Sequence, residues 1–154
     1  MSGHRALILR ETAISVAINI VLSGVFFLAL FGYGSRVPVR GWGNLAADSL
    51  PQAFAIGLMG SLVPGLLTRH RVRRGTIAPV ARSAALPVPA RALLAAGVAA
   101  AVLGGTAMAL LLVLAPDTIG FAPALLFKLL FGAAVALIVT PPAIRAALRE
   151  PFRA

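Results

Sequence analysis

Lys128 is a charged residue inside an apolar run, the segment GFAPALLFKLLFGAAVALIVTPP at positions 120–142. It is the only lysine of the chain, whose other permanently positive side chains are all arginines. An ammonium group at the centre of a membrane-spanning helix costs roughly 2.5–3.5 kcal/mol, so it requires a partner, water or access to the membrane surface. Two interpretations stay open. Lys128 contacts an ion or an anionic substrate, or it forms a buried structural pair or a snorkelling anchor.

Polar residues of the other apolar runs are the candidate companions of Lys128. Asp48 and Gln52 stand one helical turn apart at the start of the second run, and Asn19 lies within the first. In a chain that crosses the membrane at every run, the second and fourth runs start at the same face. We therefore predict that Lys128 points towards Asp48 and Gln52. Asp117, in the link before the fourth run, is a further acidic group at that level. Asn19 is expected to form a hydrogen bond across a helix interface.

The residue inventory excludes most other site chemistry. The chain has no cysteine, which excludes disulfides, a thiolate nucleophile and a cysteine-ligated metal. His4 and His70 lie in separate hydrophilic segments, and neither has a carboxylate partner at metal-binding spacing. The apolar runs hold no pair of acidic residues and no nucleophile with a neighbouring base. We expect no catalytic residues, no metal site, no cofactor and no enzymatic activity.

Composition places these residues in a membrane. The 154 residues are 60% hydrophobic and 12% charged, against about 45–50% and about 25% in soluble domains. The apolar residues form runs at 12–32, 49–68, 90–115 and 119–143, each close to the ~20 residues that a membrane-spanning helix needs. The run 49–68 is the least hydrophobic, so a re-entrant segment is the alternative to a full span. The first run has no clear cleavage site after it and is expected to be a retained helix rather than a signal peptide.

The distribution of arginines predicts the orientation. The only arginines between the first and second runs are Arg36 and Arg40, and the link after the third run has no arginine. The remaining hydrophilic segments hold Arg5, Arg10, Arg69, Arg71, Arg73, Arg74, Arg82, Arg91, Arg145, Arg149 and Arg153. The positive-inside rule therefore places both termini and the basic loop 69–91 in the cytoplasm. No aromatic residues alternate with the arginines, so nucleic acid is not an expected partner.

Two kinds of membrane contact are expected outside the hydrocarbon region. Trp42 is predicted to anchor the chain at the outer interface, where an indole ring suits the level of the headgroups. At the start of the basic loop, arginines should contact anionic lipid headgroups of the cytoplasmic leaflet. These are Arg69, Arg71, Arg73 and Arg74.

Small or polar residues recur at every fourth position in all four runs. The four stripes are Ser15, Asn19 and Ser23; Ala53, Gly57, Ser61 and Gly65; Gly97, Ala101, Gly105 and Ala109; and Gly132, Ala136 and Thr140. Residues four apart share one helix face, and small ones let helix backbones approach closely in lipid. We predict that all four stripes are packing faces, with Lys128 at the start of the fourth. Pro64 and Pro141 are predicted to mark helix ends.

The chain also divides into two similar hairpins, because a proline followed by an arginine closes both the second and the fourth run. A duplication of this kind gives two halves of the same orientation. Residues 12–75 resemble small bacterial inner-membrane proteins of unknown function that are built from a two-helix unit. The motifs that carry the resemblance are Asn19, Ser23-Gly24, Trp42, Pro51-Gln52, and Leu62-Val63-Pro64 followed by Arg69. The resemblance implies residence in the bacterial inner membrane.

Together these features predict an all-α polytopic membrane protein with a single domain over residues 1–154. Four transmembrane helices form two sequential hairpins, with both termini in the bacterial cytoplasm. The expected function is that of a structural or accessory unit, bound to membrane lipids and associated with a second copy or another membrane protein. The alternative is a small permease or channel-like transporter that works as an oligomer. In that case Asn19, Gln52 and Lys128 line its path, and Lys128 contacts an anion or substrate.

Overall fold

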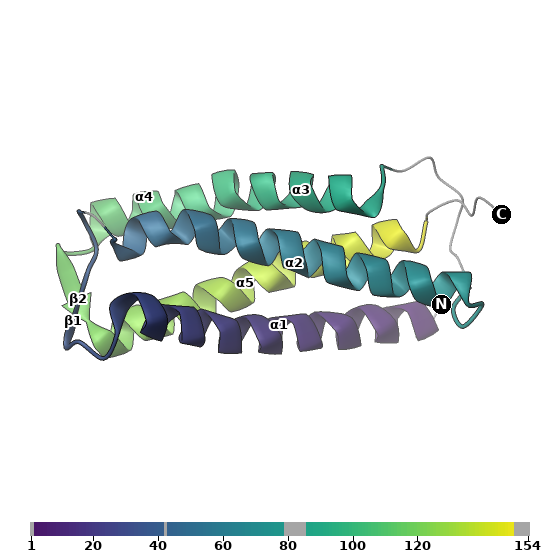
Figure 1. The fold of residues 1–154 in the computed structure, drawn as a ribbon, viewed down its shortest axis with the longest axis horizontal. Helices are drawn as coiled ribbons and strands as arrows, with labels where there is room; N and C mark the ends of the chain where they lie inside the picture. The colour runs from purple at the N-terminus through teal and green to yellow at the C-terminus, as the bar shows by residue number, and fades with distance from the viewer. Residues whose placement is uncertain (1, 42, 79–85, 150–154) are drawn as a thin grey trace.

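The computed structural model describes residues 2–41, 43–78 and 86–149, and in this part of the chain it consists of four long helices (Figure 1). They are α1 (Ser2–Phe31), α2 (Leu45–Arg73), a third helix made of three consecutive pieces, and α5 (Phe121–Ala147). The third helix comprises α3 (Val88–Val98), the π-helical turn η1 (Ala99–Gly104) and α4 (Gly105–Leu114). Each long helix has the length and apolar composition to cross a membrane. The chain is therefore a multi-pass membrane protein.

The helices extend beyond the predicted spans. α1 includes the N-terminal arm, and α2 runs on to Arg73, so the first part of the predicted loop 69–91 is helical. α2 is one uninterrupted helix of 29 residues, which is long enough for a full span. The prediction that Pro64 and Pro141 mark helix ends is wrong, since both lie inside helices together with Pro51 and Pro142. Neighbouring helices can support the carbonyls that a proline leaves free, which makes interior prolines tolerable in membranes.

Local signals account for the ends of the helices. Gly32, with φ +62°, ends α1, and Gly75, with φ +71°, follows the end of α2. Both are in the left-handed region that glycine adopts at helix C-termini. At the start of α2 the Asn44 side chain accepts a hydrogen bond of 2.7 Å from the Ala47 amide, as an N-cap residue does. α3 begins directly after Pro87.

The packing order of the helices differs from the order in the chain. α1 packs mainly against α5 and only slightly against α2, and α2 packs against both α5 and the third helix. α5 and the third helix touch little, although they are consecutive in the chain. The predicted sequential hairpins are therefore not the packing units. The helices lie side by side in the order α1, α5, α2, third helix (Figure 1).

Three of the four predicted stripes are packing faces. The stripes of α1, α2 and α5 are buried. A β-carbon on Gly57 would lie 2.9 Å from the Cα atom of Ala96 and 2.9 Å from the Cβ atom of Ala99, so only glycine permits this approach of α2 to the third helix. The prediction for the third helix is wrong, because Gly97, Ala101 and Ala109 are exposed. That helix instead packs through Val88, Ala92, Ala96, Ala99, Gly104 and Ala107.

The π-helical turn explains part of this difference. The buried residues of α3 follow the usual helical spacing up to Ala99, and the next buried position is Gly104. A π turn contains one residue more than an α turn and so shifts the face that follows it. A β-carbon on Gly104 would lie 2.9 Å from the Ser49 carbonyl oxygen of α2. Because of this shift, a small residue of the third helix faces α2 both at Ala99 and at Gly104.

A short antiparallel ribbon joins the two loops at one end of the bundle, and the sequence analysis did not predict it. β1 (Arg36–Pro38) pairs with β2 (Thr118–Gly120), with Val37 opposite Ile119. Beneath the ribbon, Phe27, Val37, Leu45 and Ala124 form a buried apolar cluster. We call this end of the bundle the ribbon end. The opposite end, where α1 starts and α5 ends, holds Arg71, Arg91 and Arg145, and we call it the arginine-rich end.

Candidate functional site

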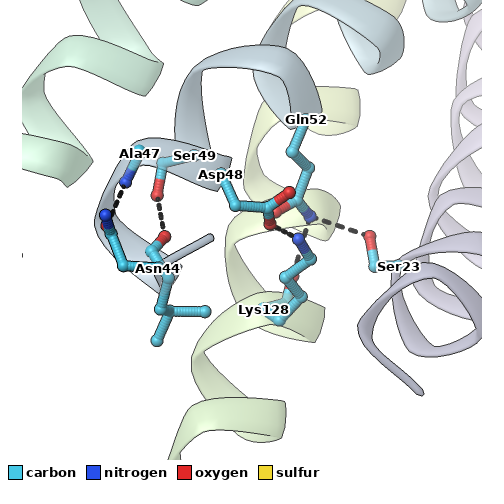
Figure 2. Close-up of polar contacts among 8 residues, drawn as sticks. Ser23, Asn44, Ala47, Asp48, Ser49, Gln52 and Lys128 are labelled. Atoms are coloured by element: carbon cyan, nitrogen blue, oxygen red, sulfur yellow. Dashed lines mark hydrogen bonds and ion pairs between the residues drawn. The ribbon is translucent and has the colours of Figure 1, made fainter. Parts of the chain in front are cut away.

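The buried ion pair between Lys128 and Asp48 is the centre of the candidate site (Figure 2). Asp48 lies in the first turn of α2, just after the Asn44 cap, where a negative charge also interacts favourably with the helix dipole. Lys128 lies in the second turn of α5 and is only 1% exposed, while the Asp48 side chain is 15% exposed. The pair therefore faces the bundle interior at the ribbon end and links α2 to α5.

Gln52 extends the ion pair into a three-helix contact. Its Nε2 atom donates hydrogen bonds to the Ser23 hydroxyl of α1, at 2.9 Å, and to the backbone carbonyl of Lys128, at 3.1 Å. Gly132 makes room for this arrangement, because a β-carbon there would lie 3.2 Å from Nε2 of Gln52 and closer still to the Ser23 hydroxyl. The ring of Phe31 lies with its centroid 6.0 Å from the Lys128 ammonium, at the outer limit of a cation–π contact.

A series of buried polar residues continues from Ser23 along α1. Asn19 and Ser15 follow at intervals of one turn, and both are buried. Asn19 Nδ2 donates to the backbone carbonyl of Ser15 at 2.8 Å, and the Thr140 hydroxyl of α5 donates to the Ser15 hydroxyl at 2.9 Å. Asn19 therefore bonds within its own helix, whereas the sequence predicted a bond across the interface. Ser15 makes that interhelical contact instead.

A second ion pair lies where this series reaches the arginine-rich end. Nη1 of Arg71 in α2 donates to Oε1 of Glu11 in α1 at 2.7 Å. The Glu11 side chain is 8% exposed and that of Arg71 is 34% exposed. We call the whole set the polar series: Glu11, Thr12, Ser15, Asn19 and Ser23 of α1 with their partners on α2 and α5. It runs through the interior from one ion pair to the other.

The structure thus brings three of the four predicted site residues together. Lys128, Asp48 and Gln52 form one cluster, while Asn19 lies further along α1 in the polar series. Asp117 is not a partner of Lys128, because it pairs with Arg40 at the surface of the ribbon end. Arg40 also donates to the Leu112 and Ala115 carbonyls at the end of α4.

The arginines predicted to contact lipid headgroups differ in their surroundings. Arg71 pairs with Glu11, while Arg73 and Arg74 are exposed and Arg69 is partly buried. Sequence reasoning did not predict the Glu11–Arg71 pair, although Glu11 continues the spacing of Ser15, Asn19 and Ser23. Trp42, Arg82 and Arg153, which carry predictions of anchoring and orientation, lie outside the described residues.

The chemistry available at this site is charge pairing and hydrogen bonding. Within residues 2–41, 43–78 and 86–149, no group of three or more histidine, cysteine or acidic side chains is arranged to hold a metal ion. Comparison with protein-family models, with curated proteins and with solved structures finds no match for this chain. The geometry of the site is therefore the basis for any functional assignment.

Proposed function

We propose that this chain is a structural or accessory protein of a bacterial inner membrane, held together by charges that pair inside the bundle. The observation that carries the proposal is the position of Lys128. Its ammonium group pairs with Asp48, its carbonyl accepts a hydrogen bond from Gln52, and the residue is 1% exposed. A lysine that two other side chains engage so closely serves to fix α5 against α2, and it leaves little access for a substrate. The bacterial origin rests on the resemblance of residues 12–75 to small inner-membrane proteins.

Both termini are proposed to lie in the cytoplasm. The support is the distribution of arginines, since the hydrophilic segments at the arginine-rich end carry most of them and those at the ribbon end carry Arg36 and Arg40. The absence of native cysteine makes a direct test simple. Thr76→Cys and Pro116→Cys place single thiols at the two ends. In intact cells a membrane-impermeant maleimide should label only Pro116→Cys, and labelling of Thr76→Cys alone would reverse the orientation.

The structural role is tested by removing both charges of the ion pair in one variant. The double variant Asp48→Asn/Lys128→Met should keep the helical content, the oligomeric mass and any partner that co-purifies with the parent protein. Proteoliposomes that contain the parent protein should show no more flux of protons, potassium, chloride or phosphate than empty liposomes. A parent-dependent flux that the double variant loses would contradict the structural assignment.

A second candidate function, transport by an oligomer, is favoured by the polar series. In the described part of the chain, Thr12 Oγ1 and Gln52 Oε1 are buried without a hydrogen-bond partner. Buried polar atoms of this kind commonly bind internal water, and a row of waters beside the series would offer a path for protons. The test is a pH-sensitive dye enclosed in proteoliposomes, with Asn19→Leu as the blocking variant and Val21→Leu, on the exposed face of α1, as its control. Proton flux that only Asn19→Leu abolishes would establish this function.

A further inference from the structure

The gap between the third helix and α5 contains an apolar groove with a polar end. These helices are consecutive in the chain but pack mainly on other helices, so a gap remains between them. One cavity of about 410 Å³ lies between α3, η1 and the last turns of α5. A second, of about 490 Å³, lies beside α4 and the middle of α5. Leu103 and Ile138 line both cavities, so the two lie next to each other along the gap, and we call them together the groove.

The groove is most polar at its arginine-rich end. Arg91 lines the first cavity at the arginine-rich end, and its guanidinium donates to the Ala146 carbonyl at 3.4 Å. Ser61 of α2 lines the same cavity and is 5% exposed, and its hydroxyl has no hydrogen-bond partner among the described residues. Towards the ribbon end the lining is apolar apart from Thr106 and includes Leu110, Phe127 and Phe131. The groove is therefore amphipathic along its length.

The charges around this end favour an anion. Arg69, Arg71, Arg73, Arg74, Arg145 and Arg149 all lie at the arginine-rich end, whereas the one carboxylate described there, Glu11, is paired with Arg71. Basic pockets between transmembrane helices on the cytoplasmic side bind anionic headgroups. A ligand that places an anionic head at Arg91 and an apolar chain along the groove matches both ends at once.

We propose that this groove is a binding site for an anionic phospholipid of the surrounding bilayer. The headgroup phosphate accepts hydrogen bonds from Arg91, a glycerol ester or hydroxyl group bonds to the Ser61 hydroxyl, and one acyl chain lies between the third helix and α5. The π-helical turn contributes to the site, because Ala99, Val102 and Leu103 of η1 line the groove. The proposal rests on residence in a membrane and on the proposed cytoplasmic position of the arginine-rich end, and it is independent of the role assigned to Lys128.

The site can be tested by native mass spectrometry of the full chain. Delipidated protein in detergent is titrated with dioleoyl phosphatidylglycerol and, separately, with dioleoyl phosphatidylcholine. One phosphatidylglycerol should remain bound with at least about tenfold preference over phosphatidylcholine. Arg91→Gln should reduce that retention at least about fivefold, and Ser61→Ala should reduce it less. The control Arg10→Gln removes an exposed arginine of α1 at the same end, which lines neither cavity, and should change nothing.

Two tryptophan variants distinguish a loss of lipid binding from a loss of folding. Val102→Trp places an indole at the groove wall, whereas Val113→Trp makes the same change at an exposed position that lines neither cavity. Val102→Trp alone should abolish lipid retention, with both variants equal in helical content and elution volume. The proposal would be overturned if the protein retained the two lipids equally, or if it retained a free fatty acid in place of a phospholipid. It would also be overturned if Val102→Cys formed a disulfide-linked dimer. The last outcome would show that a second copy occupies the groove.

Discussion

Removing the carboxylate of Asp48 is expected to destabilise the bundle strongly. Asp48→Asn keeps the shape of the side chain but leaves the Lys128 ammonium without its counter-ion in an environment where Lys128 is 1% exposed. The other described carboxylates, Glu11 and Asp117, are paired with arginines and cannot replace it. Breaking a buried ion pair from one side costs about 3–5 kcal/mol. We expect about 3 kcal/mol here, the lower end of that range, because the Asp48 side chain keeps 15% exposure.

Replacing Lys128 should lower the free energy of unfolding less than Asp48→Asn does. The double variant should lose less than the sum of the two single variants. Lys128→Met replaces the lysine by an apolar chain of similar length and leaves Asp48 at the more accessible start of α2, so we expect a loss of about 1 kcal/mol. Asp48→Asn/Lys128→Met removes both charges and should lie within about 1 kcal/mol of the parent protein. The coupling free energy between the two positions is then about 3 kcal/mol.

The measurement is reversible unfolding in mixed micelles of dodecyl maltoside and increasing sodium dodecyl sulfate, followed by far-ultraviolet circular dichroism. Asp117→Asn is the matched control, because its partner Arg40 is 43% exposed and Asp117 itself is 80% exposed. It should shift the free energy of unfolding by less than about 1 kcal/mol. A loss below about 0.5 kcal/mol for Asp48→Asn, or a coupling free energy near zero, would refute the structural role of the pair.

Three other predictions use the same unfolding measurement. Gly57→Ala should cost about 1–3 kcal/mol, because the new methyl group overlaps the backbone of the third helix. Gly97→Ala, in open space, should stabilise the protein by up to about 1 kcal/mol, and an equal loss for both would show that helix packing is not the cause. Arg71→Gln should cost about 1–3 kcal/mol by leaving a buried carboxylate without its partner, whereas Arg73→Gln should stay within about 0.5 kcal/mol. Arg40→Ala should change global stability by about 1 kcal/mol or less but speed hydrogen exchange in β2 and at the end of α4. Unchanged exchange there would contradict the bridging role of its guanidinium.

The contact of Lys128 with Asp48 and Gln52 could be predicted from sequence because it depends on few facts. Four apolar runs fix the level of each residue in the membrane, and a buried ammonium group requires a polar partner at its own level. Of the acidic residues near that level, Asp48 starts a helix and Asp117 lies in a short link. The link belongs to the ribbon, and its aspartate faces outwards to Arg40.

The packing order could not be predicted in the same way. Helix association in lipid depends on close fit rather than on burial from water, and a chain this rich in alanine and glycine offers small residues on several faces. In the third helix both the stripe of Gly97 and Ala101 and the face of Ala92 and Ala96 fit the same rule. The choice between them depends on Gly57 of α2 and on the π turn, and neither leaves a distinct pattern in the sequence.

The ribbon and the Glu11–Arg71 pair were missed for a related reason. Both join residues that are far apart in the chain, and each involves residue types that are ordinary in a polar segment. The three-residue strands are too short for any alternation of polar and apolar side chains to be recognised. Glu11 could have been found by extending the spacing of the polar residues of α1 one further turn towards the N-terminus.

The pairing of α1 with α5 has a consequence for biogenesis. Of the described helices, α1 is synthesised first and its main partner, α5, is synthesised last. At ~5–20 residues per second the chain needs some seconds to supply α5. During that interval Ser15 lacks Thr140 of α5, while Ser23 and Glu11 wait for Gln52 and Arg71 of α2. A newly inserted α1 therefore has a polar face that is not yet covered, and it becomes buried only when α2 and α5 pack against it.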